Sequence, residues 1–207
     1  MEEGNFYHIY NRGNNKQPIF FEKKNYHHFL KLFDKYLDGF VDVYAYCLMP
    51  NHFHFLIKIL ELARTIEVHQ DYRSFKNPAS LLVPAKTTVV SLDKAFKTFF
   101  MTYAKGINSV YNRTGALFQQ KFKKKEITDD SYFTSIIQYI HANPIAAGLC
   151  NSYEDWEFSS YNAIVGTNPT KIKREEVIDW FGNKDIFIKV HRERELEREK
   201  VRKFLFD

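Results

Sequence analysis

Residues 49–57 read MPNHFHFLI, and this segment constrains the fold more than any other part of the chain. Side chains alternate across a β-strand, so His52 and His54 should share one face while Phe53 and Phe55 share the other. The aromatic face predicts burial beneath helices. Two histidines at i and i+2 on the opposite face are either half of a metal site or two half-exposed strand residues, and the segment by itself leaves both interpretations open.

The rest of the chain alternates between expected strands and helices. The expected order is a strand at 5–10, a helix at 22–37, a strand at 41–48, the histidine strand, a helix from 91 to 110, a strand at 117–127 and a helix from about 128. The short turn before His52 predicts that the two middle strands pair antiparallel. A β-α-β-β-α-β order is the ferredoxin-like signature, an α+β fold whose four-stranded antiparallel sheet carries its helices on one face.

The last expected helix brings two polar side chains to one surface. Thr128 or Asp129 can cap its start, and Pro144 restricts the residue before it, so the helix is expected either to end near Asn143 or to kink there. Tyr139 and Asn143 are spaced i and i+4 and therefore lie on the same helical face. A phenol that could act as a nucleophile and an amide oxygen that could bind a cation would then share one surface.

Four motifs together resemble those of the single-tyrosine HUH transposases, most closely the REP-associated tyrosine transposases. They are the HFH strand with the helix 139–149 (YIHANPIAAGL), the opening segment 7–13 (YHIYNRG), the segment 115–123 (GALFQQKFK) and the segment 156–161 (WEFSSY). The family's versions of the last two read Gly-x-Leu-Phe/Trp-Gln-x-Arg/Lys-Phe and Trp-x-x-Ser-Ser-Tyr. The similarity spans residues 5 to about 165, and the family's fold is also ferredoxin-like.

The resemblance implies an enzyme and its site. Tyr139 corresponds to the catalytic tyrosine, and His52, His54 and Asn143 correspond to the ligands of a divalent metal ion, either Mg²⁺ or Mn²⁺. The implied reaction is cleavage and rejoining of single-stranded DNA at hairpin-forming repeats, through a 5′-phosphotyrosine intermediate with a free 3′-hydroxyl. The alternative is a domesticated, non-catalytic nucleic-acid-binding module with the same fold. Relatives work alone or as pairs, so monomer and homodimer both remain open.

Positive charge is modest overall but locally concentrated. The net charge is +5 and the isoelectric point is about 9.0. Residues 113–128 hold one acid and five basic residues among aromatic side chains: Arg113, Lys121, Lys123, Lys124 and Lys125. This pattern suits a DNA backbone whose bases stack on aromatic rings, although lysines that guard a solvated edge strand would look similar. Arg12, in the turn-rich stretch after the first strand, is a further candidate phosphate contact.

Composition and boundaries complete the sequence predictions. With 207 residues, 44% of them hydrophobic and 17% aromatic, the chain can bury one domain at 1–165, interrupted by an excursion at 60–90, and carry an accessory helical tail at 166–207. Within this tail, residues 184–203 hold eight Lys or Arg and five Asp or Glu, which predicts a solvent-facing helix. No apolar run approaches ~20 residues and the start lacks a signal-peptide pattern, so we expect a cytoplasmic protein that does not enter a membrane.

Several other aromatic and imidazole side chains receive structural interpretations. His141 follows Tyr139 by two positions and is expected at the surface, away from the tyrosine. His8 is expected to be a half-buried strand residue, with an approach to the active face as the alternative. Tyr132, at i−7 from Tyr139, is expected to pack.

Overall fold

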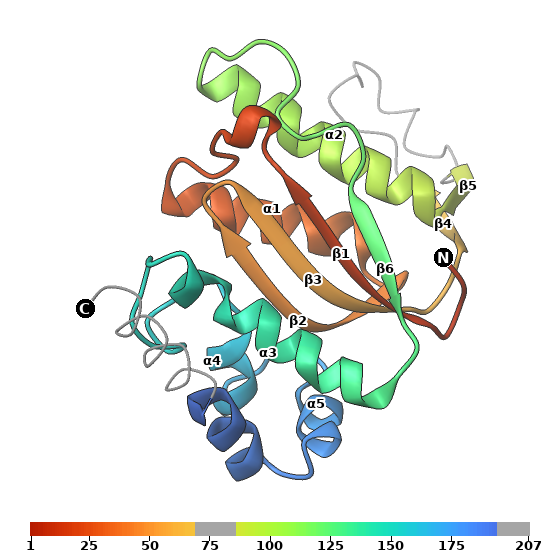
Figure 1. The fold of residues 1–207 in the computed structure, drawn as a ribbon. Coiled ribbons are helices and arrows are strands. Elements are labelled where there is room, and N and C mark those ends of the chain that lie inside the picture. Colours follow the sequence, from red (N-terminus) through yellow and green to blue (C-terminus); the bar gives the residue numbers. More distant parts are fainter. Residues whose placement is uncertain (69–85, 194–207) are drawn as a thin grey trace.

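The computed structural model describes residues 1–68 and 86–193 and contains a four-stranded antiparallel sheet (Figure 1). The strand order across this sheet is β2-β3-β1-β6, and its strands are β1 (Phe6–Arg12), β2 (Val41–Met49), β3 (His52–Ile59) and β6 (Lys123–Ile127). A tight turn joins β2 to β3, and the two strands pair antiparallel. The strand order and the antiparallel pairing confirm the predicted α+β, ferredoxin-like architecture.

Two helices cover one face of this sheet, α1 (Lys23–Leu37) and α2 (Leu92–Val110) (Figure 1). Their inner faces are rich in phenylalanine, and these rings meet the aromatic residues of β3. The rings of Phe33 and Phe55 stack with centroids 4.4 Å apart, and Phe29 lies edge-on to Phe99 at 4.8 Å. This aromatic layer fixes which face of β3 points inward, so His52 and His54 must point to the opposite face.

The opposite face is covered by α3 (Asp130–Ala146) and by the C-terminal segments around it. These segments are α4 (Tyr161–Val165), α5 (Arg174–Trp180) and a helical stretch at 184–193. Ile137 and Ile140 of α3 are fully buried against Leu56 of β3, and Trp180 of α5 stacks on Phe133 of α3 at 4.4 Å. The sheet therefore separates two cores, with α1 and α2 on one side and α3 on the other.

The helix α3 does not end near Asn143, which is one of the two outcomes that the sequence predicts. It continues through Pro144 to Ala146. Pro144 has no N–H to donate to the carbonyl of Ile140 four residues earlier. The side-chain amide of Asn143 donates to this carbonyl at 3.4 Å and to the carbonyl of Tyr139 at 2.8 Å. Asn143 thereby compensates for the missing backbone donor, and the helix persists for another turn.

The strand β6 is shorter than the predicted strand at 117–127. Residues 117–122 are not part of the regular strand pairing, because Leu117 and Phe118 are buried in the core with α2. The backbone of this segment instead forms hydrogen bonds at the end of β1. Asn14 N–H donates to the Leu117 carbonyl at 2.9 Å, and Gln119 N–H donates to the Arg12 carbonyl at 2.9 Å. The 3₁₀ turn η1 (Asn14–Lys16) follows β1 at this point.

Two expectations about the remaining segments need revision. Part of the excursion at 60–90 is regular, because β4 (Ala63–Val68) pairs antiparallel with β5 (Lys86–Ser91), while residues 69–85 lie outside the described part of the chain. The stretch at 184–193 faces solvent over most of its surface but also buries one stripe, because Phe187 and His191 are fully buried against α3 and α4. Residues 194–207 also lie outside the described range. No helix at 1–68 or 86–193 is both long and apolar enough to traverse a bilayer.

Candidate active site

The two histidines of the HFH motif lie on the central strand β3, on the face covered by α3. His52 is opposite Met49 of β2 and Arg12 of β1, and His54 is opposite Cys47 and Tyr10. Their ring centroids are 5.2 Å apart and the ring planes are perpendicular. Strand alternation and the pairing on both sides of β3 thus hold two imidazoles next to each other on a rigid surface.

Each of the two imidazoles has a hydrogen-bond partner at Nδ1. His52 Nδ1 is 2.7 Å from the side-chain oxygen of Asn51, and His54 Nδ1 is 2.9 Å from Nε2 of His8. His8 lies on β1, is buried, and stacks against the His54 ring at 5.1 Å. The expectation of a half-buried strand residue is therefore wrong, and His8 belongs to the site.

The environment favours neutral imidazoles. Burial lowers the pKa of His54 well below its usual value, and the neighbouring His8, His52 and Arg12 add to this effect. Burial also lowers the pKa of His52, aided by Arg12 and opposed by a side-chain hydrogen bond with Asn143. Burial and Lys125 lower the pKa of His8 to about 4. Neutral imidazole is the form that binds metal ions, so these rings need no deprotonation near pH 7.

Tyr139 projects from α3 toward the histidines. Its ring lies edge-on to His54 with centroids 5.5 Å apart, and edge-on to His8 at 6.1 Å. The buried Ile136, Ile137 and Ile140 fix the rotation of α3, and the Asp129 carboxylate caps its start by accepting from Tyr132 N–H at 3.2 Å. Tyr139 itself remains 39% exposed. A phenol beside the histidine pair is thus open to a substrate.

Asn143 lies one turn after Tyr139 and completes the cluster. Its amide nitrogen is engaged by the backbone carbonyls of α3, as described above, which leaves the side-chain oxygen for other contacts. The Asn143 side chain also lies near enough to His52 to raise the pKa of that imidazole. The four predicted site residues, two from β3 and two from α3, therefore come together although about 85 residues separate the two motifs.

The donor set is suited to a divalent cation. Hydrogen bonds at Nδ1 leave Nε2 of His52 and of His54 as candidate ligand atoms, and the Asn143 oxygen is a third candidate. Among residues 1–68 and 86–193, no three His, Cys, Asp or Glu side chains are arranged to hold a metal, so a three-ligand site needs the amide. His8, His52 and His54 do not form such a group, and Nε2 of His8 faces His54 Nδ1. Two imidazoles and an amide oxygen fit Mn²⁺ or Mg²⁺.

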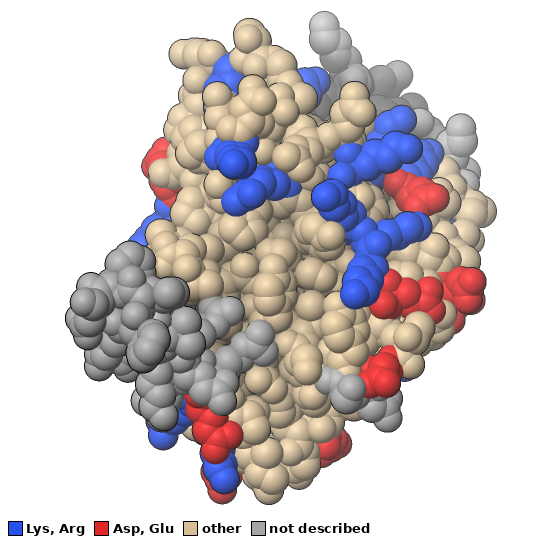
Figure 2. Space-filling model, viewed as in Figure 1, with Lys and Arg blue, Asp and Glu red and all other residues tan. Residues whose placement is uncertain are grey.

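The predicted DNA-contacting residues divide between the site face and other surfaces. Figure 2 shows Lys and Arg side chains gathered over the region of β6. Lys123 and Lys125 pair with Tyr10 and His8 across β1, so strand alternation puts them on the site face. Lys124 pairs with the buried Ile9 and belongs to the other face. Lys121 is exposed in the segment before β6.

The two predicted arginines follow different elements: Arg12 is the last residue of β1, and Arg113 comes shortly after the end of α2. Arg12 is paired with His52, and its guanidinium Nε is buried without a hydrogen-bond partner. Arg113 follows α2, donates to the Gln17 side chain at 3.0 Å and lies 5.6 Å above the Phe21 ring. The structure therefore brings Arg12 to the histidine pair and places Arg113 on a neighbouring surface.

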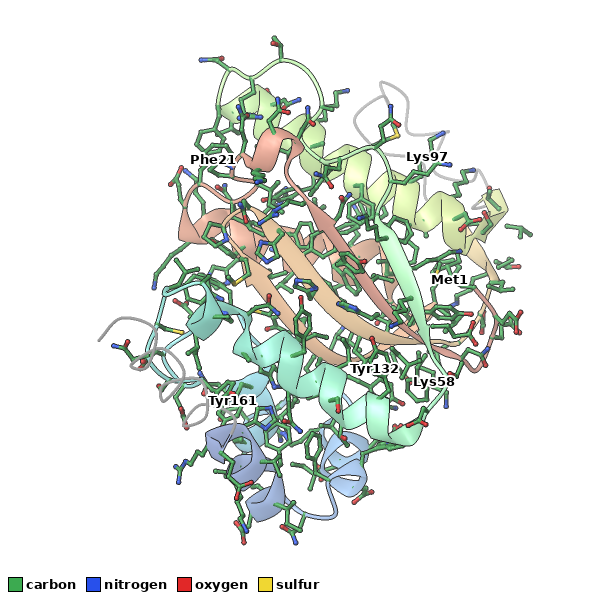
Figure 3. The ribbon with its side chains drawn as sticks, in the orientation of Figure 1. Met1, Phe21, Lys58, Lys97, Tyr132 and Tyr161 are labelled. Atoms are coloured by element: carbon green, nitrogen blue, oxygen red, sulfur yellow. The ribbon has the colours of Figure 1, made fainter. Side chains whose placement is uncertain are left out.

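Tyr10 is a site residue that sequence analysis missed. Its ring stacks on His8 at 4.8 Å and on His54 at 5.6 Å, and Lys123 Nζ lies 6.0 Å from its centroid. Tyr132 has a similar partner in Lys125 Nζ, 4.5 Å from the ring centroid, at the β6 side of α3 (Figure 3). The available signal was alternation in β1, which puts residues 8, 10 and 12 on one face. Aromatic rings beside ammonium groups thus border the histidine pair.

His141 does not lie at the surface, which corrects the sequence prediction. It points away from Tyr139 as expected but is 1% exposed. Its Nδ1 is 3.0 Å from His191 Nε2, and its Nε2 is 2.8 Å from the Ser160 hydroxyl. The prediction failed because segments after residue 150 cover this side of α3. No pattern in the residues around His141 indicates that these distant segments pack there.

A solved structure of a REP-associated tyrosine transposase bound to a REP hairpin resembles this chain with a TM-score of 0.55. The match covers 79% of this chain and 81% of the transposase at 16% sequence identity. The two proteins share a fold. No protein-family model matches the sequence, and no curated protein matches it significantly. Because the sequences have diverged this far, the likeness establishes the architecture, and the chemistry of this chain rests on its own site.

Proposed function

We propose that this protein is a metal-dependent endonuclease and strand transferase for single-stranded DNA, a transposase of the tyrosine type. The observation that carries the proposal is the meeting of Tyr139 with His52, His54 and Asn143 of the same chain. An exposed phenol beside neutral imidazoles and the Asn143 amide oxygen provides a nucleophile and a cation site within one cluster. The shared fold with a transposase that was solved on a REP hairpin supports hairpin-forming DNA as the substrate.

In this proposal Tyr139 is the nucleophile, and the other three side chains of the cluster are cation ligands. The Tyr139 oxygen attacks the scissile phosphorus and loses its proton, and the bond to the 3′ oxygen breaks as that oxygen gains a proton. The products are a 5′-phosphotyrosine link and a free 3′-hydroxyl. A divalent cation held by His52, His54 and Asn143 would neutralise charge on the phosphate and align it for attack. A 3′-hydroxyl can reverse the step, because the link conserves the phosphodiester.

The residues around the cluster bind and orient the DNA strand. Arg12, Lys123 and Lys125 lie on the site face and would bind phosphates on either side of the scissile one. Tyr10 presents a ring between Lys123 and the histidines, where a base can stack. Since Tyr139 lies beside the histidines of its own chain, we propose that one chain carries out cleavage.

The experiment is to incubate the protein with a hairpin-bearing oligonucleotide and Mn²⁺ and to detect the covalent adduct by denaturing gel and mass spectrometry. Tyr139→Phe should remove the adduct and leave hairpin binding within about threefold, because only the nucleophilic oxygen is lost. Tyr36→Phe is the matched control, since Tyr36 lies on α1 beneath the other face of the sheet. His52→Ala should also abolish the adduct while binding persists.

Two outcomes would contradict parts of this proposal. An adduct that forms equally well in Tyr139→Phe would reject the tyrosine. A wild-type protein that binds the hairpin but forms no adduct with Mn²⁺ or Mg²⁺ would favour the alternative, a non-catalytic DNA-binding module that uses the basic residues around β6.

A further inference from the structure

His8 contacts a proposed metal ligand without being placed to bind the metal itself. It lies on β1, is 6% exposed, and its Nε2 is 2.9 Å from Nδ1 of His54. We propose that His8 is a positioning residue that accepts a hydrogen bond from His54 Nδ1–H and thereby presents the His54 Nε2 lone pair to the cation. This inference rests on the proposed function, because it assumes that His54 is a metal ligand.

The argument begins with the protons on the two rings. A neutral imidazole carries one N–H and one lone pair, so one proton lies between His8 Nε2 and His54 Nδ1. If His54 donates, its Nε2 has a lone pair and can bind a metal ion. If His8 donates, the proton of His54 is on Nε2 and that nitrogen cannot be a ligand. The cation therefore requires His8 to be the acceptor.

His52 shows a related arrangement, in which an amide oxygen faces Nδ1. The atom facing its Nδ1 is the side-chain oxygen of Asn51, which accepts and cannot donate. A proton on Nδ1 has an acceptor at this position, and binding of a cation at Nε2 requires this tautomer of His52. The two histidines of the motif are then oriented alike, one by an amide oxygen and the other by an imidazole.

Packing holds the His8 ring in place for this contact. Its ring lies nearly parallel to the His54 ring, with an angle of 19°, and nearly parallel to the Tyr10 ring, with an angle of 23°. β1 is paired on both sides, by β3 and β6, so the backbone of His8 lies in the interior of the sheet. The contact is therefore a feature of the folded sheet and does not depend on a surface side chain.

The test compares two substitutions at His8 that differ in hydrogen bonding. In His8→Gln the amide oxygen can still accept from His54, whereas in His8→Phe a ring of similar size cannot. His27→Phe is the control, because His27 is an exposed residue of α1 with 63% of its side chain accessible. Thermal unfolding of each variant shows whether the fold is retained.

The first readout is the nitrogen-15 NMR spectrum of the metal-free protein, which reports the tautomer of His54. We expect Nδ1–H in the wild type, in His8→Gln and in His27→Phe, and a mixture of tautomers in His8→Phe. The second readout is Mn²⁺ affinity by calorimetry. We expect the dissociation constant to rise about 10–100-fold in His8→Phe and to stay within about threefold in His8→Gln.

The outcomes separate this inference from the proposed function. If the wild type binds Mn²⁺ and folded His8→Phe binds it equally tightly, the role of His8 is refuted while the metal site stands. The same holds if His54 carries its proton on Nε2 in the wild type. If the wild type does not bind Mn²⁺ and the tautomers behave as expected, the metal-dependent function is wrong, and with it the purpose given to His8.

Discussion

Two consecutive lysines on the edge strand β6 point to opposite faces of the sheet. Lys123 is opposite Tyr10 and shares the face of the histidines, whereas Lys124 is opposite the buried Ile9. Both are exposed, carry the same charge and occur in the same strand. They therefore form a matched pair that distinguishes a DNA path across the site face from general attraction to a basic edge.

We expect Lys123→Ala to weaken hairpin binding more than Lys124→Ala. A lysine that contacts a phosphate contributes about 0.7 to the slope of log K against log salt concentration on single-stranded DNA. Titrations at several salt concentrations should therefore show a slope reduced by about 0.7 for Lys123→Ala and nearly unchanged for Lys124→Ala. Equal losses in the two variants would show that the strand is not bound along the histidine face.

Residue-level predictions from sequence succeeded where the determining pattern is local. Alternation in residues 52–57 is enough to put His52 and His54 together, because it depends on the strand alone. The contact between His8 and His54 depends on the register of β1 against β3, which no local pattern reveals. The burial of His141 likewise depends on segments far along the chain.

At the level of elements, a buried chain of hydrogen bonds connects α3 to its surroundings. His191 Nδ1 donates to the Phe187 carbonyl at 2.8 Å, and His191 Nε2 faces His141. His141 then contacts the Ser160 hydroxyl, which also accepts from Tyr46 N–H at 2.9 Å. The helix that carries the tyrosine is thus joined to the 184–193 helix, to the segment before α4 and to β2.

Ser160→Ala should lower the free energy of unfolding by about 3 kcal/mol, because it leaves both His141 Nε2 and Tyr46 N–H unpaired in the core. Ser159→Ala is the control. Ser159 is also buried, but its hydroxyl accepts from Tyr161 N–H at 3.2 Å and is not part of the histidine chain, so we expect a loss of about 1 kcal/mol. Urea unfolding measures the free energy of unfolding of both variants. Equal losses would show that the hydrogen bonds through His141 and Ser160 add no stability of their own.

Elements could be predicted from sequence more reliably than their ends. The turn at 49–51, the helical spacing in 22–37 and the cap at Asp129 are local signals, and each corresponds to an observed feature. The end of α3 could not be predicted from Pro144, because the Asn143 side chain replaces the lost backbone donor. The start of β6 was misplaced because burial of Leu117 and Phe118 draws the chain out of the sheet.

For the whole molecule, buried neutral histidines make stability depend on pH. Burial, and secondarily His191, lower the pKa of His141 well below its usual value of 6.5. Below pH 6.5 the unfolded chain therefore binds a proton that the folded chain excludes, so stability must fall as the pH falls. An imidazole that stays neutral in the folded chain over this whole range costs at most about 2 kcal/mol between pH 6.5 and pH 5.

Urea unfolding at pH 7 and pH 5 should show this loss. His141→Leu should be less stable at pH 7 and should lose less stability on acidification, since one buried imidazole is gone. The exposed His28→Leu serves as the control and should behave as the wild type does. A free energy of unfolding that stays constant from pH 7 to pH 5 would be incompatible with these neutral histidines.

The overall topology was predictable because the order of strands and helices and one tight hairpin leave few antiparallel arrangements. The contribution of 184–193 to the second core could not be predicted. The many charged residues of 184–203 suggest exposure, and within its described part, 184–193, only Phe187 and His191 are buried. The composition of a segment gives its average polarity, whereas packing of a helix depends on the few side chains along one of its faces.

The burial of Phe187 and His191 against α3 also has a consequence for the order of events during synthesis. The histidine strand emerges from the ribosome early, whereas the side of α3 that carries His141 is covered only after the 184–193 helix has been made. A growing chain can therefore pair β1 with β3 before α3 has all of its contacts. In the function proposed above, an incomplete polypeptide would hold both imidazoles before its nucleophile is fixed in place.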